Sequence, residues 1–164
     1  MTFVLLGDTL VIETQNGVKE RVRLLGIDAP ETKQTCLDKA GIQYACGIEA
    51  KQSLEKIIGR DAVKCLAAKR DQYSRILGVC FDEKTGQELN KELVVEGEAV
   101  AYQQYSKAYV TQEEGAKKLG RGVWKGTFDK PWEFRKQKRA ASARAAAPAA
   151  PAASQPSVAS DDDI

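Results

Sequence analysis

Two of the four cysteines are placed symmetrically around a short polar turn, and this placement constrains the fold more than any other feature. Cys65 and Cys80 lie at equal distances from the turn at residues 70–75. The flanking segments 62–68 and 75–81 are rich in apolar and β-branched residues, which is typical of strands. In a simple antiparallel hairpin the two cysteines would lie directly opposite each other, within reach of a disulfide bond. The sequence therefore predicts a hairpin closed by a cross-strand pair.

The other two cysteines, Cys36 and Cys46, would close a short loop if they paired, and this is the most local of the three possible connectivities. Two disulfides require an oxidising compartment, so we expect a secreted or periplasmic protein. Four reduced cysteines in a cytosolic protein are the alternative. A zinc site is disfavoured, because no two cysteines have the paired C-x-x-C spacing of such sites.

The two ends of the chain differ from the part between them. Residues 1–6 are too few for the charged and apolar regions of a signal peptide, and no segment has the length of a membrane span. From about Ala140 the chain is rich in Ala, Pro and Ser and ends in an acidic cluster, which is typical of a disordered tail. A partner-binding segment is the alternative. We therefore expect one domain over residues 1–137 and a disordered tail over residues 138–164.

Strand and helix patterns alternate along the folded part. Segments 9–13 and 18–25 flank a Gln-Asn-Gly turn and predict a second hairpin. Apolar residues at helical spacing predict a helix that ends at Gly59. Two more helices are expected, one capped by Asn90 and one beginning near Thr111 with the spacing of a capping box.

The order of these elements is strands, a helix, two strands and two helices. This order predicts an α+β fold, in which a five-stranded OB-fold barrel carries about three helices and presents a face suited to nucleic acid. Other α+β arrangements are open on the pattern alone. Lys and Arg number 25 against 23 Asp and Glu, and the tail holds one of the bases and three of the acids. The folded part thus carries a mild positive excess, which permits a polyanionic partner without requiring one.

Histidine is absent, so catalysis has to use carboxylates, Arg, Lys, Tyr or Cys. Asp8, Asp28 and Glu31 adjoin turn-forming Gly or Pro residues at expected strand ends, and such oxygen ligands suit Ca²⁺ or Mg²⁺ rather than zinc. Arg23 and Arg75 belong to different strands, so their guanidiniums could bind one phosphate from two directions. Each of these residues also has an ordinary explanation, as a turn acid, a surface charge or an ion-pair partner.

Four motifs, in matching order and spacing, resemble the staphylococcal (micrococcal) nuclease family over most of residues 1–137. The segment 23–32, Arg-Leu-Leu-Gly-Ile-Asp-Ala-Pro-Glu-Thr, is similar to the family signature R-L-x-x-[IV]-D-x-P-E-T. Gly-Asp-Thr at 7–9 and Asp-Gln-Tyr-Ser-Arg at 71–75 match G-D-T and D-x-Y-x-R. The segment 89–97 matches the helix after the barrel. The resemblance implies a nuclease domain built on an OB-fold.

By this resemblance the protein is expected to hydrolyse phosphodiester bonds in DNA and RNA, nearly without regard to sequence, and to leave 3′-phosphates. Asp8 and Asp28 are implied to bind Ca²⁺, helped by the backbone carbonyl of Ala29. Glu31 is implied to orient or deprotonate the attacking water. We expect a monomer that does not associate with membranes.

The same resemblance assigns four residues to the substrate. Arg23 and Arg75 are implied to bind the scissile phosphate and to stabilise its transition state. Tyr73 and Tyr102 are implied to line the nucleotide site.

Three departures from the family pattern carry expectations of their own. Ala29 stands where the best-known member has threonine, which removes a hydroxyl but keeps the carbonyl, so we expect activity to survive. Leu6 replaces an aspartate, so metal affinity is expected to be weaker. Only six residues precede Gly7, so the first barrel strand is expected to be truncated. A natural gene product that starts further upstream would explain the short strand, the missing signal peptide and the cysteines together.

Two other functions compete with the nuclease. A catalytically inactive module could bind nucleic acid or a partner protein through the same barrel, although it would not need all five charged residues of the expected site. A metal-free OB-type protein could bind single strands. Its support is a cluster of three tyrosines, Tyr102, Tyr105 and Tyr109.

Overall fold

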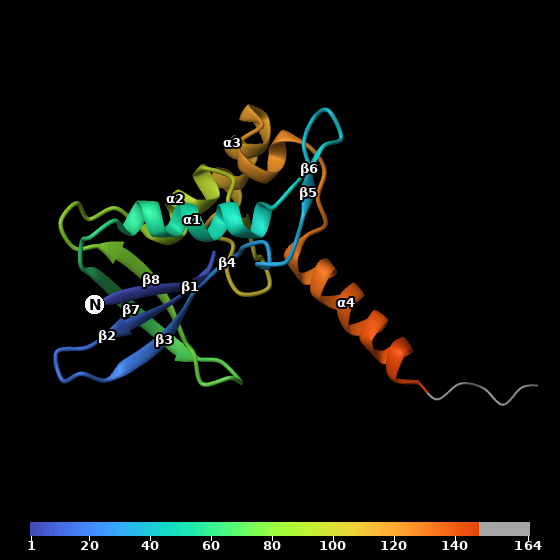
Figure 1. The fold of residues 1–164 in the computed structure, drawn as a ribbon. Coiled ribbons are helices and arrows are strands. Elements are labelled where there is room, and N and C mark those ends of the chain that lie inside the picture. Colours follow the sequence, from blue (N-terminus) through green and yellow to red (C-terminus); the bar gives the residue numbers. More distant parts are fainter. Residues whose placement is uncertain (148–164) are drawn as a thin grey trace, which may run out of the picture.

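The computed structural model describes residues 1–147, and in Figure 1 three helices lie together at one end of a sheet. The strands of this sheet are β1 (Thr2–Leu6), β2 (Thr9–Glu13), β3 (Lys19–Leu24), β7 (Val63–Arg70) and β8 (Ile76–Asp82). The helices are α1 (Cys46–Ile58), α2 (Leu89–Val95), α3 (Val110–Leu119) and α4 (Pro131–Ala146), with a short 3₁₀ helix η1 (Gly122–Lys125). Two small ladders pair β4 (Ile27–Asp28) with β9 (Val100–Ala101) and β5 (Cys36–Leu37) with β6 (Gln43–Tyr44). The fold is α+β, as the sequence predicts.

The five strands of the main sheet are hydrogen-bonded in the order β1-β2-β3-β8-β7. Neighbouring strands are antiparallel, except that β3 and β8 run parallel. Residues 2–6, expected to be a truncated strand, form β1 and pair with β2 along their length. Within residues 1–147 the sheet is not closed into the expected barrel, because β1 and β7 are its two edges. A register shift between Val4 and Leu6 bends the β1 edge, and such bulges end regular pairing.

The hairpin of β7 and β8 has the register that the cysteine spacing predicts. Cys65 lies directly opposite Cys80, and the two form a disulfide. Cys36 and Cys46 form the second disulfide, which ties strand β5 to the first turn of α1. The described residues contain no free cysteine. Both predicted pairs are confirmed, and two disulfides indicate a location outside the cytoplasm.

Loss of the hairpin disulfide is expected to lower the stability of the fold. A Cys65→Ala/Cys80→Ala variant should lose about 2–4 kcal/mol of the free energy of unfolding, because an unfolded chain without the cross-link gains conformational freedom. Urea denaturation of the variant and the wild type measures this loss. Equal midpoints and slopes for the two proteins would contradict the expectation.

The main core lies between the sheet and the helices. Leu10, Val22 and Leu24 face it from the strands, and Ala50 and Leu54 face it from α1, all at most 1% exposed. The spacing of the α1 residues is the helical periodicity that predicted this element, and its end at Gly59 is also confirmed. The core therefore holds α1 against β1 and the turn at Gly7.

Two predicted helix starts are wrong in detail. Asn90 does not cap α2 but lies inside it, fully buried. Its amide donates to the carbonyls of Leu25 and Gly78 and accepts from the backbone of Cys80, so it joins α2 to the sheet. Thr111 lies within α3, which begins at residue 110, and its side chain makes no capping hydrogen bond. At α2, tertiary contacts of Asn90 override the local capping signal.

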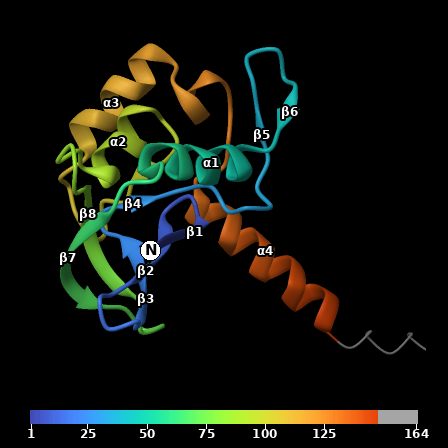
Figure 2. The same cartoon turned by 60° about the vertical axis from the view of Figure 1, so that its left-hand side comes forward.

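Helix α4 extends past the predicted boundary between domain and tail. Helix α4 runs through residue 146, whereas the disordered tail was expected from residue 138. Ala has the highest helix propensity of all residues, so an Ala-rich segment with few Gly or Pro continues a helix once tertiary contacts have started it. Helix α4 projects from the body in both views (Figures 1 and 2). The rest of the predicted tail, residues 148–164, lies outside the described residues.

Among residues 1–147, no helix combines the length and the apolar character needed to cross a bilayer.

Candidate functional site

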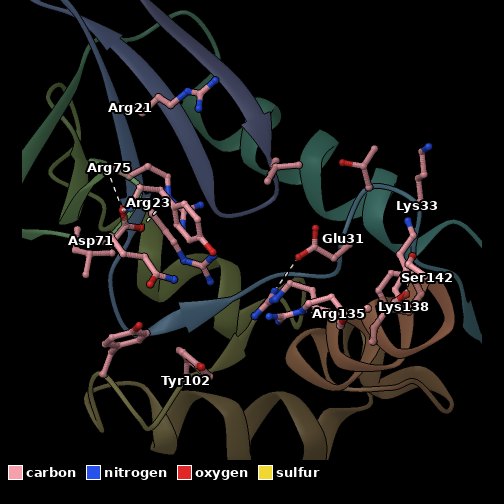
Figure 3. A pocket seen from close by; sticks show the side chains of 18 residues that line it. Arg21, Arg23, Glu31, Lys33, Asp71, Arg75, Tyr102, Arg135, Lys138 and Ser142 are labelled. Atoms are coloured by element: carbon pink, nitrogen blue, oxygen red, sulfur yellow. Dashed lines mark hydrogen bonds and ion pairs between the residues drawn. The ribbon is translucent and has the colours of Figure 1, made fainter. Parts of the chain in front are cut away.

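A cleft of about 960 Å³ lies between the sheet and α4 and gathers most of the charged residues singled out by the sequence. Figure 3 shows Arg23, Asp71 and Arg75 on one side of it, with Glu31 and Arg135 paired near its middle. Of the predicted site residues, the cleft is lined by Arg23, Glu31, Tyr73, Arg75 and Tyr102. The fold thus brings together residues separated by up to about 80 positions in the chain.

Asp8 is held beneath this cleft by the turn between β1 and β2. A Cβ at Gly7 would lie 2.8 Å from the Cβ of Ala50 and 2.9 Å from that of Ala29, so only glycine lets α1 approach this turn so closely. The Thr9 hydroxyl and the Ala29 N–H each donate to a different oxygen of Asp8, over 2.9 and 3.0 Å. The buried carboxylate is therefore fixed in place by its neighbours.

Arg23 joins the two predicted metal ligands. Its Nη2 lies 2.8 Å from Asp28 Oδ1 and 3.3 Å from Asp8 Oδ2. Burial alone would lower the pKa of the Arg23 guanidinium, but the negative charges of Asp8 and Asp28 outweigh it and leave the pKa raised. Arg23 is therefore charged, and both carboxylates point toward the same nitrogen.

A third arginine, which the sequence did not indicate, also contacts these acids. Arg135, on the first turns of α4, donates from Nη2 to Asp28 Oδ2 over 2.7 Å and from Nη1 to Asp28 Oδ1 over 3.0 Å. The same Nη1 donates to Glu31 Oε1 over 2.8 Å. Burial raises the pKa of Asp28 in spite of these contacts. Burial would lower the pKa of Arg135, but its hydrogen bonds to Asp28 and Glu31 and the negative charges of both acids together outweigh this, and the pKa is raised.

Glu31 is positioned by its backbone. A Cβ at Gly47 would lie 1.7 Å from the carbonyl oxygen of Glu31, so the absence of a side chain lets the start of α1 pack directly on this segment. The Glu31 N–H donates to the buried amide of Gln34, and the Gln34 side chain in turn donates to the carbonyl of Asp129 just before α4. Gln34 therefore links the Glu31 segment to the base of α4, a role with no signal in the sequence.

Arg75 is oriented by Asp71 across the turn of the β7–β8 hairpin. Asp71 accepts from the backbone N–H groups of Tyr73 and Arg75 and from Arg75 Nε, the last over 2.8 Å. Ser74 has a φ of 62°, so the turn passes through the left-handed region at a residue other than glycine. Tyr73 is 67% exposed, and its ring lies 5.4 Å from Arg75 Cζ. The terminal nitrogens of Arg75 are left to face the cleft.

Two of the three tyrosines near residue 105 line the cleft, and the third does not. The Tyr102 ring lies 5.1 Å from that of Tyr105 and 5.2 Å from that of Trp132, at the start of α4. Tyr109 is buried and donates its hydroxyl to Glu88 over 2.6 Å. The proposed three-tyrosine stacking platform is therefore wrong, since Tyr109 belongs to the core.

The acids of the site are the type of ligand that a hard cation such as Ca²⁺ prefers. Asp8 and Asp28 supply carboxylate oxygens, which Ca²⁺ prefers, and they converge on one point. No group of three His, Cys, Asp or Glu side chains in the described part of the chain is arranged to hold a metal, so further ligands would have to be backbone carbonyls or water. A cation shared by Asp8 and Asp28 would have to displace Arg23 Nη2, which lies between the two carboxylates, and Arg135 from Asp28. The role of the Ala29 carbonyl stays a prediction.

Comparison with known proteins places these residues in context. Residues 21–126 match the family described as staphylococcal nuclease homologue. The micrococcal nuclease of Shigella flexneri is 32% identical over 151 residues, which cover 85% of this chain and 80% of that protein. An uncharacterized endonuclease of Haemophilus influenzae is 33% identical, over 81% of this chain and 70% of its own length. The succinoglycan biosynthesis protein ExoI of Rhizobium meliloti is 36% identical over 74% of this chain, and the match spans 62% of its length.

Proposed function

Because this chain belongs to the family of staphylococcal nuclease homologues, we propose that it is a Ca²⁺-dependent endonuclease that hydrolyses phosphodiester bonds of DNA and RNA. The proposed products carry 3′-phosphates. Relatives that are named nucleases support a nuclease in general. The single observation that carries the proposal is that Arg23, Glu31 and Arg75 line one cleft, and that Arg23 also contacts Asp8 and Asp28.

The residues of the chain have separate tasks in this reaction. The guanidiniums of Arg23 and Arg75 bind nonbridging oxygens of the phosphate and neutralise the charge that grows on them as phosphorus becomes five-coordinate. Glu31 accepts a proton from the attacking water, whose oxygen bonds to phosphorus. The bond from phosphorus to the 5′-oxygen breaks, and that oxygen leaves as a hydroxyl with a proton from solvent. A Ca²⁺ held by Asp8, Asp28 and the Ala29 carbonyl would add positive charge to the phosphate.

Digestion with end-group analysis tests this proposal. Purified protein is incubated with supercoiled plasmid and with single-stranded RNA, in Ca²⁺, in Mg²⁺ and in chelator. We expect both substrates to be degraded in Ca²⁺ and neither in chelator, with fragments that accept a 5′ label directly and need phosphatase before 3′ extension. Degradation in chelator, or fragments that carry 5′-phosphates, would contradict the proposal.

One observation favours a second function. The hydrogen bonds from Arg135 to Asp28 and Glu31 occupy two of the acids that cleavage needs. A module that binds nucleic acid without cutting it would have this arrangement permanently. Binding of nucleic acid by folded protein, without cleavage in any metal, would support this alternative.

The competition between Arg135 and a cation gives a prediction of its own. Arg135→Gln should bind Ca²⁺ at least about tenfold more tightly than the wild type, because a positive charge next to Asp28 is removed. Titration calorimetry with Ca²⁺ alone measures the affinity without substrate. Arg144→Gln removes an equal charge from the exposed end of the same helix and serves as the control. Equal affinities for the wild type and Arg135→Gln would contradict the competition.

Substrate range and location follow from the same features. Contacts dominated by phosphate read no base edges, so we propose cleavage nearly independent of sequence. Secretion or a periplasmic location is proposed from the two disulfides. The protein is proposed to act as a monomer.

A further inference from the structure

We propose that α4 forms the second wall of a nucleic-acid channel, in which Lys33, Lys138 and Arg139 bind phosphates that flank the scissile one. The channel extends the cleft away from Arg75 along the projecting helix. This inference rests on the proposed function for the identity of the ligand, a strand of DNA or RNA. It does not rest on cleavage, because binding along the channel is measured without a metal.

The basic residues of α4 share the face that borders the cleft. Lys138, Arg139 and Ser142 follow Arg135 at intervals of three, four and seven residues, so all four lie on one side of the helix. All four line the cleft, which settles the direction of this face. The one acid in α4, Glu133, is not among the lining residues. The wall that α4 contributes is therefore purely cationic in its charges.

This wall continues the cleft beyond the reacting centre. In Figure 3, Glu31 and Arg135 lie between Arg23 and Arg75 on one side and Lys33 and Lys138 on the other. From Arg135 to Ser142 the helix rises by roughly 10 Å. A phosphate at Arg23 and Arg75 therefore leaves neighbouring phosphates of the same strand within reach of this face, whereas a very short oligonucleotide ends before it.

The charges on this wall have no carboxylate partner among the described residues, although Arg139 Nε donates to the Arg135 carbonyl and Lys138 lies over the Phe134 ring. Lys33, Lys138 and Arg139 are exposed, and none of them forms a salt bridge within residues 1–147. Other bases near the site, Arg23 and Arg135, are paired with carboxylates. Unpaired bases on one face of a cleft attract a polyanion and release its counterions on binding.

The base of the wall is held firmly against the body. Trp132 packs on Tyr102, and the Gln34 side chain donates to the carbonyl of Asp129, two residues before α4 begins. Tyr105 extends the aromatic surface and is 52% exposed. Cationic and aromatic groups side by side are typical of sites that bind single strands. The channel therefore suits a flexible strand better than a rigid duplex.

Binding of labelled single-stranded DNA in chelator tests the channel. A Lys138→Gln/Arg139→Gln variant should bind a 16-nucleotide strand about tenfold or more weakly than the wild type. The slope of log affinity against log salt should fall by about 1.4, which corresponds to two lost phosphate contacts on a single strand. A 4-nucleotide strand should bind both proteins within about twofold. Lys91→Gln/Lys118→Gln removes two exposed charges outside the cleft. This control should bind both the 16-nucleotide and the 4-nucleotide strand with the affinity of the wild type.

Several outcomes would overturn the channel. One is an unchanged affinity and salt slope of Lys138→Gln/Arg139→Gln for the 16-nucleotide strand. Another is an equal loss of affinity for the 16- and 4-nucleotide strands, and a third is an equal loss of affinity in Lys91→Gln/Lys118→Gln. Lys138→Arg/Arg139→Lys keeps both charges and should retain long-strand binding, so a loss there would also count against it. Absence of cleavage by the wild type in Ca²⁺ would contradict the proposed nuclease activity. The strand affinities measured in chelator would still test the channel separately.

Discussion

Cleavage of DNA and RNA by Glu31→Gln is expected to be about 10²–10⁴-fold slower than by the wild type, because the amide cannot accept the proton of the attacking water. The amide can still accept the hydrogen bond from Arg135, so the fold and the shape of the cleft are kept. Initial rates on one single-stranded oligonucleotide in saturating Ca²⁺ measure the effect. Thermal unfolding of the variant should match that of the wild type.

Glu114→Gln is the matched control, since Glu114 is exposed on α3 and does not line the cleft. Its rate should equal that of the wild type. A cleavage rate of Glu31→Gln within about threefold of the wild-type rate would show that Glu31 is not the general base. The reaction would then have to proceed without a general base at this position.

Loss of the Arg75 guanidinium is expected to have the second largest effect. Arg75→Gln should reduce the turnover rate by about 10²–10³-fold, because one of two guanidiniums that stabilise the developing charge on phosphorus is removed. The effect should fall on kcat more than on KM, since this charge is greatest in the transition state. Steady-state kinetics on the same oligonucleotide separate the two parameters.

Arg70→Gln is the control on the same hairpin. Arg70 pairs with Glu20 on the exposed side of the sheet and does not line the cleft. Removal of its charge leaves the overall charge equal to that of Arg75→Gln, so a general electrostatic effect would slow both variants alike. A loss confined to KM, or one shared by the two variants, would contradict the role of Arg75 in the transition state.

Sequence patterns predicted those features whose partners lie nearby in the chain or in a regular element. Cys65 and Cys80 were placed correctly because the register of a hairpin follows from the position of its turn. The end of α1 at Gly59 was predicted from helical periodicity and a residue that tolerates a positive φ. The family resemblance assigned Asp8 and Asp28 to a metal and Arg23 to the phosphate; these roles stay predictions, while the structure places both carboxylates in contact with Arg23.

Features that depend on distant contacts were missed. Arg135 lies 107 residues after Asp28, and nothing in its local sequence distinguishes it from the other bases of α4. Asn90 has the character of a helix cap, but its three hydrogen bonds reach strand β8 and the loop after β3. Residues 138–146 have the composition of a disordered tail, yet they continue a helix whose first turns are anchored by Trp132. In each case the deciding contact is tertiary.

The most direct test of the account is the cleavage rate of one single-stranded oligonucleotide as a function of free Ca²⁺, for the wild type and for Asp8→Asn. We expect no cleavage in chelator and a rate that saturates with Ca²⁺ in the wild type. Asp8→Asn should need a higher Ca²⁺ concentration for the same rate, because one of the two converging carboxylates is lost. A wild-type rate that is independent of Ca²⁺, or identical curves for the two proteins, would contradict a metal-dependent nuclease at this site.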